Sequence, residues 1–154
     1  MYLVVGTGSN LKDRLANLNE ARERLKEYFE LVAESRIYCS KAEDYLDQPF
    51  FYNQVLEFKL PVMSPQDVMH ILLDIEDEMG RLREISKGPR IIDLDILFMG
   101  ENRIKQKIVE IPHPRLFDRS FVVTPLKDLP CFSELSSRYS FRESFENPAT
   151  PVVC

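Results

Sequence analysis

The spacing of apolar residues over the first 50 positions predicts two strands with a helix between them. Residues 2–8, YLVVGTG, form a short apolar run that ends in glycine and is typical of a buried strand. Apolar residues then recur at helical spacing and predict an amphipathic helix over 11–29: Leu11, Leu15, Leu18, Leu25 and Phe29. Residues 31–38 are expected to form a second strand, and the charged, aperiodic segment 39–49 a loop.

The next segments are predicted to be a strand and a well-delimited helix. Residues 50–60 alternate between two faces; one carries Phe51 and Asn53, and the other becomes uniformly apolar toward its end. Residues 64–80 begin with serine and proline and end with glycine, which are common boundary signals of a helix. The apolar face of this helix consists of Val68, Leu72, Ile75 and Met79.

Two carboxylates interrupt the apolar strand segment 91–98. On a strand, Asp93 and Asp95 point to the same face, about 6 to 7 Å apart, while the residues between and beside them face the core. Those core residues are Ile92, Leu94 and Ile96. Such a pair can simply be solvated on an exposed sheet face, or it can form a binding site.

The order strand, helix, strand, strand, helix, strand predicts an α+β fold of the ferredoxin-like class. Two helices then cover one face of an antiparallel sheet, and the other face is left open. A further short strand is expected near 103–109, and the tail is expected to contain a short helix and irregular chain. We expect one domain over 1–154, with a βαββαβ core at 1–130 and a C-terminal extension at 131–154.

Length and composition are those of one globular domain. The chain has 154 residues, of which 44% are hydrophobic and 29% charged, so it can bury a core of its own. Its three cysteines, at positions 39, 131 and 154, are too widely spaced for a zinc site or a disulfide framework. The N-terminus lacks a signal-peptide pattern, and no apolar run approaches the roughly 18 residues of a membrane span. We expect a soluble, cytoplasmic monomer that does not bind membranes.

Charge is unevenly distributed along the chain. The formal net charge is −5, whereas residues 81–119 contain more basic than acidic side chains and are locally positive. A basic field on an acidic protein suits a compact polyanion such as a nucleotide, and a nucleic-acid duplex would need a wider basic patch. No nucleic-acid partner is therefore expected.

Arginines near the aspartate pair favour a binding site. Arg90 precedes the pair, and Arg81 and Arg83 stand in the loop before it. Neighbouring carboxylates repel each other, and Mg²⁺ is a common compensation because it takes carboxylates together with substrate phosphates. Asp93, Asp95 and the arginines therefore predict a site for a metal and phosphates.

The segment GPRIIDLDIL at 88–97 resembles the signature of the 6-hydroxymethyl-7,8-dihydropterin pyrophosphokinase family of folate biosynthesis. Four other blocks agree in order and spacing: GTGSNLKDR at 6–14, DQPFFYNQV at 47–55, IEDEMGRLR at 75–83 and IPHPRLFDRSFVVTPL at 111–126. The resemblance covers residues 1–130. It implies a ferredoxin-like fold, ATP and the pterin as substrates, and two Mg²⁺ ions as cofactors.

The resemblance assigns the charged residues to metal, phosphate and catalysis. It implies that Asp93 and Asp95 bind the two Mg²⁺ ions, which bridge the ATP phosphates. The implied catalytic residues are Arg81, Arg83, Arg90 and Asp95, with Arg83 in a loop that closes over the reactants. The implied nucleotide contacts are Glu76, Arg81, Arg90, His113 and Arg119. From the residues alone, Glu76 could equally be surface charge and His113 an ordinary loop residue.

A second set of residues is assigned to the pterin. The resemblance implies that Phe51 and Phe121 sandwich the ring and that the Asn53 amide reads its hydrogen-bonding edge. The loop from Ser40 to Glu43 is expected to add backbone contacts. Without the resemblance, phenylalanines at such positions more often belong to a core. A strand amide beside an aromatic ring favours a planar heterocycle, because the amide needs a polar partner.

The chain departs from the family pattern in two loops. Ser86 and Lys87 stand where a basic and a bulky aromatic residue are common, and the segment 40–46 is more charged than the usual threonine- and proline-rich version. No general base stands out. Deprotonation by metal coordination is preferred, with Asp95 as a candidate proton acceptor. The GTGSN turn lacks the ending of a phosphate-binding loop, and Asn10 is expected to cap the first helix.

The expected activity is transfer of pyrophosphate from ATP to 6-hydroxymethyl-7,8-dihydropterin, giving AMP and the pterin diphosphate. Two alternatives come from other classes. An RNA-binding module would use aromatic residues on an open sheet, but the acidic balance and the lack of a basic aromatic motif count against it. A non-catalytic ferredoxin-like domain that binds a small molecule would have no need for the aspartate pair.

Overall fold

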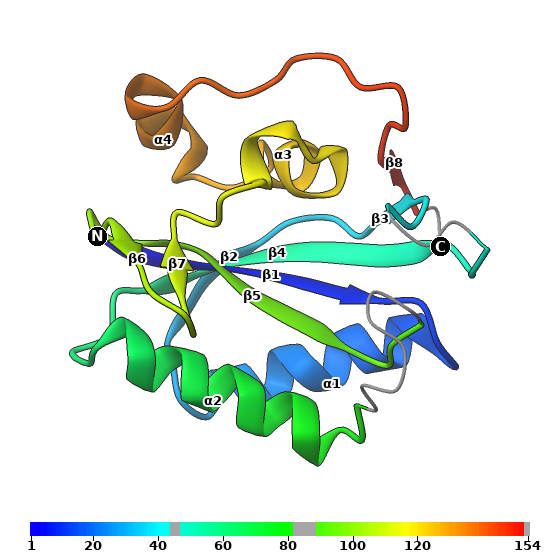
Figure 1. The fold of residues 1–154 in the computed structure, drawn as a ribbon, viewed down its shortest axis with the longest axis horizontal. Coiled ribbons are helices and arrows are strands. Elements are labelled where there is room, and N and C mark those ends of the chain that lie inside the picture. Colours follow the sequence, from blue (N-terminus) through cyan, green and yellow to red (C-terminus); the bar gives the residue numbers. More distant parts are fainter. Residues whose placement is uncertain (44–46, 82–88, 153–154) are drawn as a thin grey trace.

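The computed structural model describes residues 1–43, 47–81 and 89–152, and Figure 1 shows a sheet that lies between two layers of helices. The strands are β1 (Tyr2–Ser9), β2 (Leu31–Glu34), β3 (Tyr38–Ser40), β4 (Phe51–Lys59), β5 (Asp93–Met99), β6 (Ile104–Lys105), β7 (Glu110–Ile111) and β8 (Thr150–Pro151). The helices are α1 (Arg14–Lys26), α2 (Pro65–Glu78), α3 (Ser120–Leu126) and α4 (Phe132–Arg138), with a short 3-10 helix η1 (Leu116–Asp118) before α3.

The main sheet has the strand order β5-β1-β4-β3-β8, and β2 also pairs with β4. Neighbouring strands run antiparallel throughout this sheet. β6 and β7 form a separate antiparallel pair. The chain therefore has a mixed α+β fold with an antiparallel sheet, and β1 lies between the two strands, β4 and β5, that carry most of the predicted site residues.

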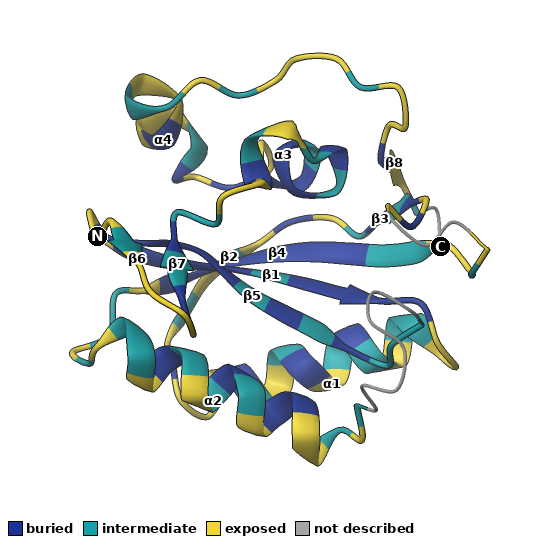
Figure 2. Ribbon diagram, in the orientation of Figure 1, coloured by how far each residue is buried: buried dark blue, intermediate teal, exposed yellow. Residues whose placement is uncertain are grey.

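Helices α1 and α2 pack on one face of the sheet and enclose the larger core (Figure 2). Its fully buried members include Leu3, Leu18, Leu25, Leu56, Phe58, Leu72, Ile75 and Leu94. Helix α2 begins as predicted, because Ser64 Oγ accepts the Asp67 N–H at 3.1 Å. Helix α1 is shorter than expected and is capped by Asp13, whose side chain accepts the Ala16 N–H. The assignment of Asn10 as the cap is wrong.

The opposite face of the sheet is not open, which corrects the expectation from sequence. α3, α4 and the tail cross this face in Figure 1 and bury a second apolar cluster against it. Val4, Val55 and Phe98 belong to this cluster on the sheet side. Since these side chains are apolar, leaving the face uncovered would expose them to water at a cost of about 25 cal/mol per Å².

Short elements depart from the predicted boundaries. The predicted strand at 31–38 is two strands, because between them Ser35 Oγ accepts the Val55 N–H in place of a regular ladder bond. The strand expected near 103–109 is the pair β6 and β7. The tail contains a short helix and irregular chain, as predicted, and also β8, which pairs with β3. No helix in the described ranges is long and apolar enough to cross a membrane.

Candidate active site

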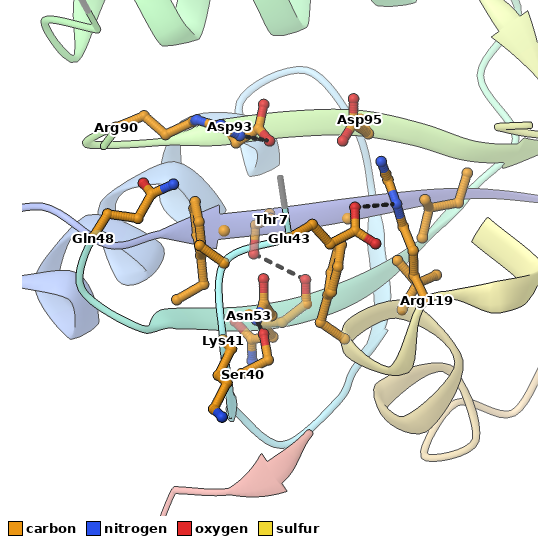
Figure 3. Close-up of a pocket in the computed structure, with 18 residues that line it drawn as sticks. Thr7, Ser40, Lys41, Glu43, Gln48, Asn53, Arg90, Asp93, Asp95 and Arg119 are labelled. Carbon is orange, nitrogen blue, oxygen red and sulfur yellow. Dashed lines mark hydrogen bonds and ion pairs between the residues drawn. The ribbon is translucent and has the colours of Figure 1, made fainter. Parts of the chain in front are cut away.

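A pocket opens on the face of the sheet that also carries α3 (Figure 3). Its floor is formed by β1 and by the facing parts of β4 and β5. One wall is the segment 40–43 after β3, and the other is the start of α3 with Arg119 and Phe121. The pocket therefore joins segments that lie far apart in the sequence.

Glycines in β1 give the floor its shape. Gly8 lies opposite Asn53 on β4 and opposite Asp93 on β5. Gly6 lies opposite Asp95. Residues paired directly across strands point to the same face, so the amide and both carboxylates share one surface. A Cβ on Gly8 would lie 3.0 Å from Asn53 Oδ1, so a side chain at this position would push into the amide.

Asp93 is held between two arginines. Arg81 NH1 lies 3.0 Å from Asp93 Oδ1, and Arg90 NH1 lies 3.1 Å from Oδ2. The side chains are 15% exposed in Arg81, 17% in Arg90 and 27% in Asp93, so water screens these pairs less than ordinary surface pairs. The structure thus brings together one aspartate and two arginines that the sequence predicts for the site.

Asp95 lies in an environment that disfavours its charge. Burial and the neighbouring Asp93 carboxylate raise the pKa of Asp95 to about 7. Glu76 acts in the same direction, and the positive charges of Arg119 and Arg81 oppose it. A carboxylate in this position would be stabilised by a nearby cation.

The two carboxylates have the donor chemistry that Mg²⁺ prefers. No group of three or more His, Cys, Asp and Glu side chains among the described residues could hold a metal. Mg²⁺ often takes only one or two carboxylates and fills its shell with water and substrate phosphates. The donor set of Asp93 and Asp95 therefore suits a metal that binds together with phosphates.

Glu76 is buried, so the reading of this residue as surface charge is wrong. It is 1% exposed on the inner side of α2. Its Oε2 accepts hydrogen bonds from Arg81 NH1 and from the Leu94 N–H, both at 2.7 Å. Leu94 stands between the two aspartates, so Glu76 fixes both Arg81 and the backbone that carries the carboxylate pair.

The other end of the pocket is lined by an amide and aromatic rings. Asn53 is 5% exposed, and its Nδ2 donates to Ser40 Oγ at 2.8 Å. Phe51 and Phe121 both line the pocket. The Arg90 guanidinium lies 5.2 Å from the centre of the Phe51 ring, within the range of a cation–π contact. Arg90 therefore touches both ends of the pocket.

Glu43 forms ion pairs with arginines at the edge of the pocket. Its Oε1 lies 3.1 Å from Arg119 Nε, the contact drawn in Figure 3, and 3.3 Å from Arg115 NH2. The sequence predicts only backbone contacts from this loop. Nearby, burial and the positive charge of Arg119 lower the pKa of His113 to about 4, so this imidazole is neutral at pH 7.

The pocket brings most of the predicted site residues together. Those that line it are Ser40, Glu43, Phe51, Asn53, Arg90, Asp93, Asp95, Arg119 and Phe121. Arg81, Glu76 and His113 are not among the described residues of its lining. Arg83 lies outside the described part of the chain, as do Ser86 and Lys87.

Sequence reasoning missed several lining residues. Thr7 lines the floor, and its Oγ1 donates to the Gln54 carbonyl at 2.9 Å. Gln48 also lines the pocket, whereas Lys41 belongs to the segment 40–43 that was expected to contribute contacts. Gln48 stands in the same sequence block as Phe51 and Asn53, and that proximity was a signal that could have found it.

The same pocket lies in the part of the chain that matches a known family. Residues 4–130 match the family model described as 7,8-dihydro-6-hydroxymethylpterin-pyrophosphokinase (HPPK). The chain belongs to the HPPK family. The match includes every predicted site residue and ends before the C-terminal extension.

Curated relatives of the HPPK family agree over the same region. The 2-amino-4-hydroxy-6-hydroxymethyldihydropteridine pyrophosphokinase of Aquifex aeolicus is 38% identical over 125 residues, a match that covers 81% of this chain and 78% of the relative. The protein of the same name from Pseudomonas aeruginosa is 39% identical, with the same coverage of both chains. The folic acid synthesis protein fol1 of Pneumocystis carinii is 40% identical, and the match covers 81% of this chain but only 17% of that protein.

Solved structures agree on the fold. A crystal structure of wild-type Plasmodium falciparum HPPK-DHPS with pteroate superposes with a TM-score of 0.59. The alignment covers 82% of this chain and 40% of that chain, at 16% sequence identity. At this identity, the similarity concerns the fold alone.

Proposed function

We propose that this chain transfers pyrophosphate from ATP to 6-hydroxymethyl-7,8-dihydropterin in folate biosynthesis, giving AMP and 6-hydroxymethyl-7,8-dihydropterin diphosphate. The observation that carries the proposal is a single pocket with two unlike ends, paired carboxylates with arginines at one and an amide with phenylalanines at the other. A nucleotide and a flat heterocycle need these two kinds of surface side by side. Membership of the HPPK family supports the same reaction.

Arg90 and Arg119 are the proposed phosphate ligands within the pocket. Both line it, and the guanidinium fork matches phosphate oxygens in bidentate geometry. For Arg81 we propose a supporting role, because its guanidinium is shared between Glu76 and Asp93. Phosphoryl-type transfer depends mainly on such positioning and electrostatics.

The bond changes of the proposed reaction follow from its products. The hydroxymethyl oxygen attacks the β-phosphorus, and the bond from this phosphorus to the α,β-bridging oxygen breaks. That oxygen leaves with AMP. The hydroxyl proton is finally released to solvent. The Asp95 carboxylate is our candidate for the protein group that accepts it first.

Asp93 and Asp95 are the proposed ligands of two Mg²⁺ ions. When bound, Mg²⁺ neutralises charge on phosphate oxygens and lowers the pKa of a coordinated hydroxyl. The protein fixes the positions of the two carboxylates. Arg81 and Arg90 hold the Asp93 side chain, and Glu76 holds the backbone between the aspartates.

The pterin is proposed to lie between Phe51 and Phe121 with its polar edge at Asn53. Asn53 Nδ2 donates to Ser40, which orients the amide before a ligand binds. The remaining amide hydrogen and the oxygen are suited to a heterocycle with alternating donors and acceptors. Glycine at position 8 leaves the space over the amide free.

We also propose that the fold is ferredoxin-like and that residues 1–154 form one domain with a core at 1–130. The antiparallel order of β5, β1, β4 and β3, with α1 and α2 on the same face, supports the fold assignment. The second apolar cluster contains residues from both the sheet and the tail, and this shared packing supports a single domain. A monomeric state and a cytoplasmic location remain proposals from the sequence.

The proposal is tested by incubating the protein with ATP, Mg²⁺ and the pterin and measuring AMP. We expect AMP only when the pterin is present, and an Asp95→Asn variant should lose nearly all of it. ADP as the nucleotide product would contradict the proposed bond cleavage. No turnover by the folded wild-type protein would favour the non-catalytic binding domain.

A further inference from the structure

Asn10 is a buried side chain that ties together three segments around the pocket. It stands just after β1 and is 2% exposed. Its Nδ2 donates to Gln48 Oε1 at 2.8 Å and to the Pro49 carbonyl at 3.0 Å. Both hydrogens of the amide therefore have partners in the segment that leads into β4.

The other half of the same side chain holds Arg90. Asn10 Oδ1 accepts the Arg90 N–H at 2.8 Å, and the Asn10 N–H donates to the Arg90 carbonyl at 3.1 Å. These two bonds clamp the backbone of Arg90 against the end of β1. An asparagine provides both functions, because its amide has two donor hydrogens beside an acceptor oxygen.

The segments that Asn10 joins carry groups at both ends of the pocket. Arg90 pairs with Asp93 at the charged end, and its guanidinium lies over Phe51. Gln48 lines the wall three residues before Phe51. A shift of Asn10 would therefore move the proposed phosphate ligand and the proposed ring platform relative to each other.

We infer that Asn10 is a positioning residue that sets the distance between the phosphate-binding and pterin-binding ends of the pocket. This inference rests on the proposed pyrophosphoryl transfer. Asn10 acts through Arg90 and the segment 48–49. Since displacement of a reacting group by about 1 Å can cost about 100-fold in rate, loss of this clamp is expected to lower kcat more than it lowers stability.

The first test is Asn10→Asp, which keeps the size of the side chain and the acceptor for the Arg90 N–H. The substitution replaces the donor amide by an oxygen that faces the Pro49 carbonyl, and two acceptors repel. Gln48 can rotate its side-chain amide and donate to the new carboxylate, whereas the Pro49 carbonyl can only accept a hydrogen bond. We expect kcat to fall about 10- to 100-fold while the folded fraction at 25 °C remains that of the wild type.

Asn17→Asp is the matched control. Asn17 lies in α1, and its Nδ2 donates to Ser9 Oγ at 3.1 Å and to the Leu11 carbonyl at 2.9 Å, on either side of Asn10 in the chain. Neither of these bonds involves segment 48–49 or Arg90. We expect kcat within about threefold of wild type for this variant. Equal losses of kcat in the two variants would overturn the positioning role, because disturbance of the turn would then be the common cause.

A second measurement does not depend on turnover. Asn10→Ala removes the acceptor for the Arg90 N–H, so amide hydrogen exchange at Arg90, measured by NMR, should become at least about tenfold faster than in the wild type and in Asn17→Ala. Unchanged exchange would overturn the clamp. If the wild type makes no AMP but exchange at Arg90 responds as expected, the proposed reaction fails and the clamp stands.

Discussion

The two ends of the pocket are built in different ways. Most of the charged end comes from the stretch of chain between Glu76 and Asp95, whose side chains hold one another through ion pairs. Arg119 joins it from the segment before α3. The neutral end collects Ser40, Asn53 and Phe121 from three distant segments, with one hydrogen bond between the first two. One end is an ionic network, and the other is a surface assembled by the fold.

This difference predicts how each end responds to its ligand. A triphosphate that binds the charged end competes with existing partners, since Arg90 is paired with Asp93 and Arg119 with Glu43. A heterocycle that binds the neutral end displaces water from groups whose protein contacts can remain. Changes at the charged end should therefore alter kcat or ATP binding, and changes at the neutral end should alter pterin binding alone.

The largest expected effect is at Asp95. Asp95→Asn should lower kcat by about 1,000-fold, because it removes one of the two proposed metal carboxylates. The substitution keeps the shape of the side chain and relieves repulsion with Asp93, so the melting temperature should not fall. Steady-state AMP formation and calorimetry check the two statements, with the exposed Asp77→Asn as control. Retention of more than a tenth of wild-type kcat would contradict the role.

Asn53→Ala should break the neutral end selectively. We expect the KM for the pterin to rise about 10- to 100-fold, because the substitution removes an oriented hydrogen-bonding group. The KM for ATP should stay within about twofold, since the Asn53 amide is uncharged and donates to Ser40 at the neutral end. Both constants are measured by varying one substrate at saturation of the other. Equal changes in the two constants would show that the ends are not separable.

A smaller effect is expected for the support behind the charged end. Glu76→Gln retains oxygen for the two hydrogen bonds to Arg81 and Leu94 but loses the charge. We expect about tenfold lower kcat and a loss of about 1 to 3 kcal/mol in the free energy of unfolding. Kinetics and urea denaturation test this, with Asp77→Asn again as control. If the variant is destabilised but keeps the wild-type kcat, Glu76 contributes to the stability of the fold and not to catalysis.

The smallest effect, and one of opposite sign, is expected at Glu43. Glu43→Gln frees Arg119 from a competing carboxylate, so the KM for ATP should fall about two- to fivefold at low ionic strength. The difference should shrink at high salt, because the pair is partly exposed to solvent. The KM for ATP measured at two salt concentrations tests this. A higher KM for the variant would show that Glu43 assists the nucleotide.

Local sequence patterns predicted the charged end well. Alternation on β5 places Asp93 and Asp95 on one face and buries Leu94 and Ile96 on the other, and this needs no information from distant residues. Arg90 was predicted in the site because it precedes the aspartates, and its ion pair with Asp93 at 3.1 Å is a finding of the structure. Patterns with a period of two residues are reliable where one face of a strand is buried.

Features that depend on distant partners were missed. Glu76 follows Ile75 on the buried side of α2, and a sequence gives no reason to bury a carboxylate until Arg81 and the Leu94 N–H are placed beside it. The cover on the second sheet face was missed because α3 and α4 have seven residues each, too few for a clear periodicity. Asn10 resembles a helix cap in sequence, and its partners are 38 to 80 positions away.

The most direct test of the central claim is ³¹P NMR of the reaction products. With ATP, Mg²⁺ and 6-hydroxymethyl-7,8-dihydropterin, the protein should produce equal amounts of AMP and a diphosphate ester whose two coupled phosphorus signals belong to the pterin. The Asp95→Asn variant should leave the ATP signals nearly unchanged over the same period. ADP with a pterin monophosphate, or AMP with free pyrophosphate and unmodified pterin, would contradict pyrophosphoryl transfer.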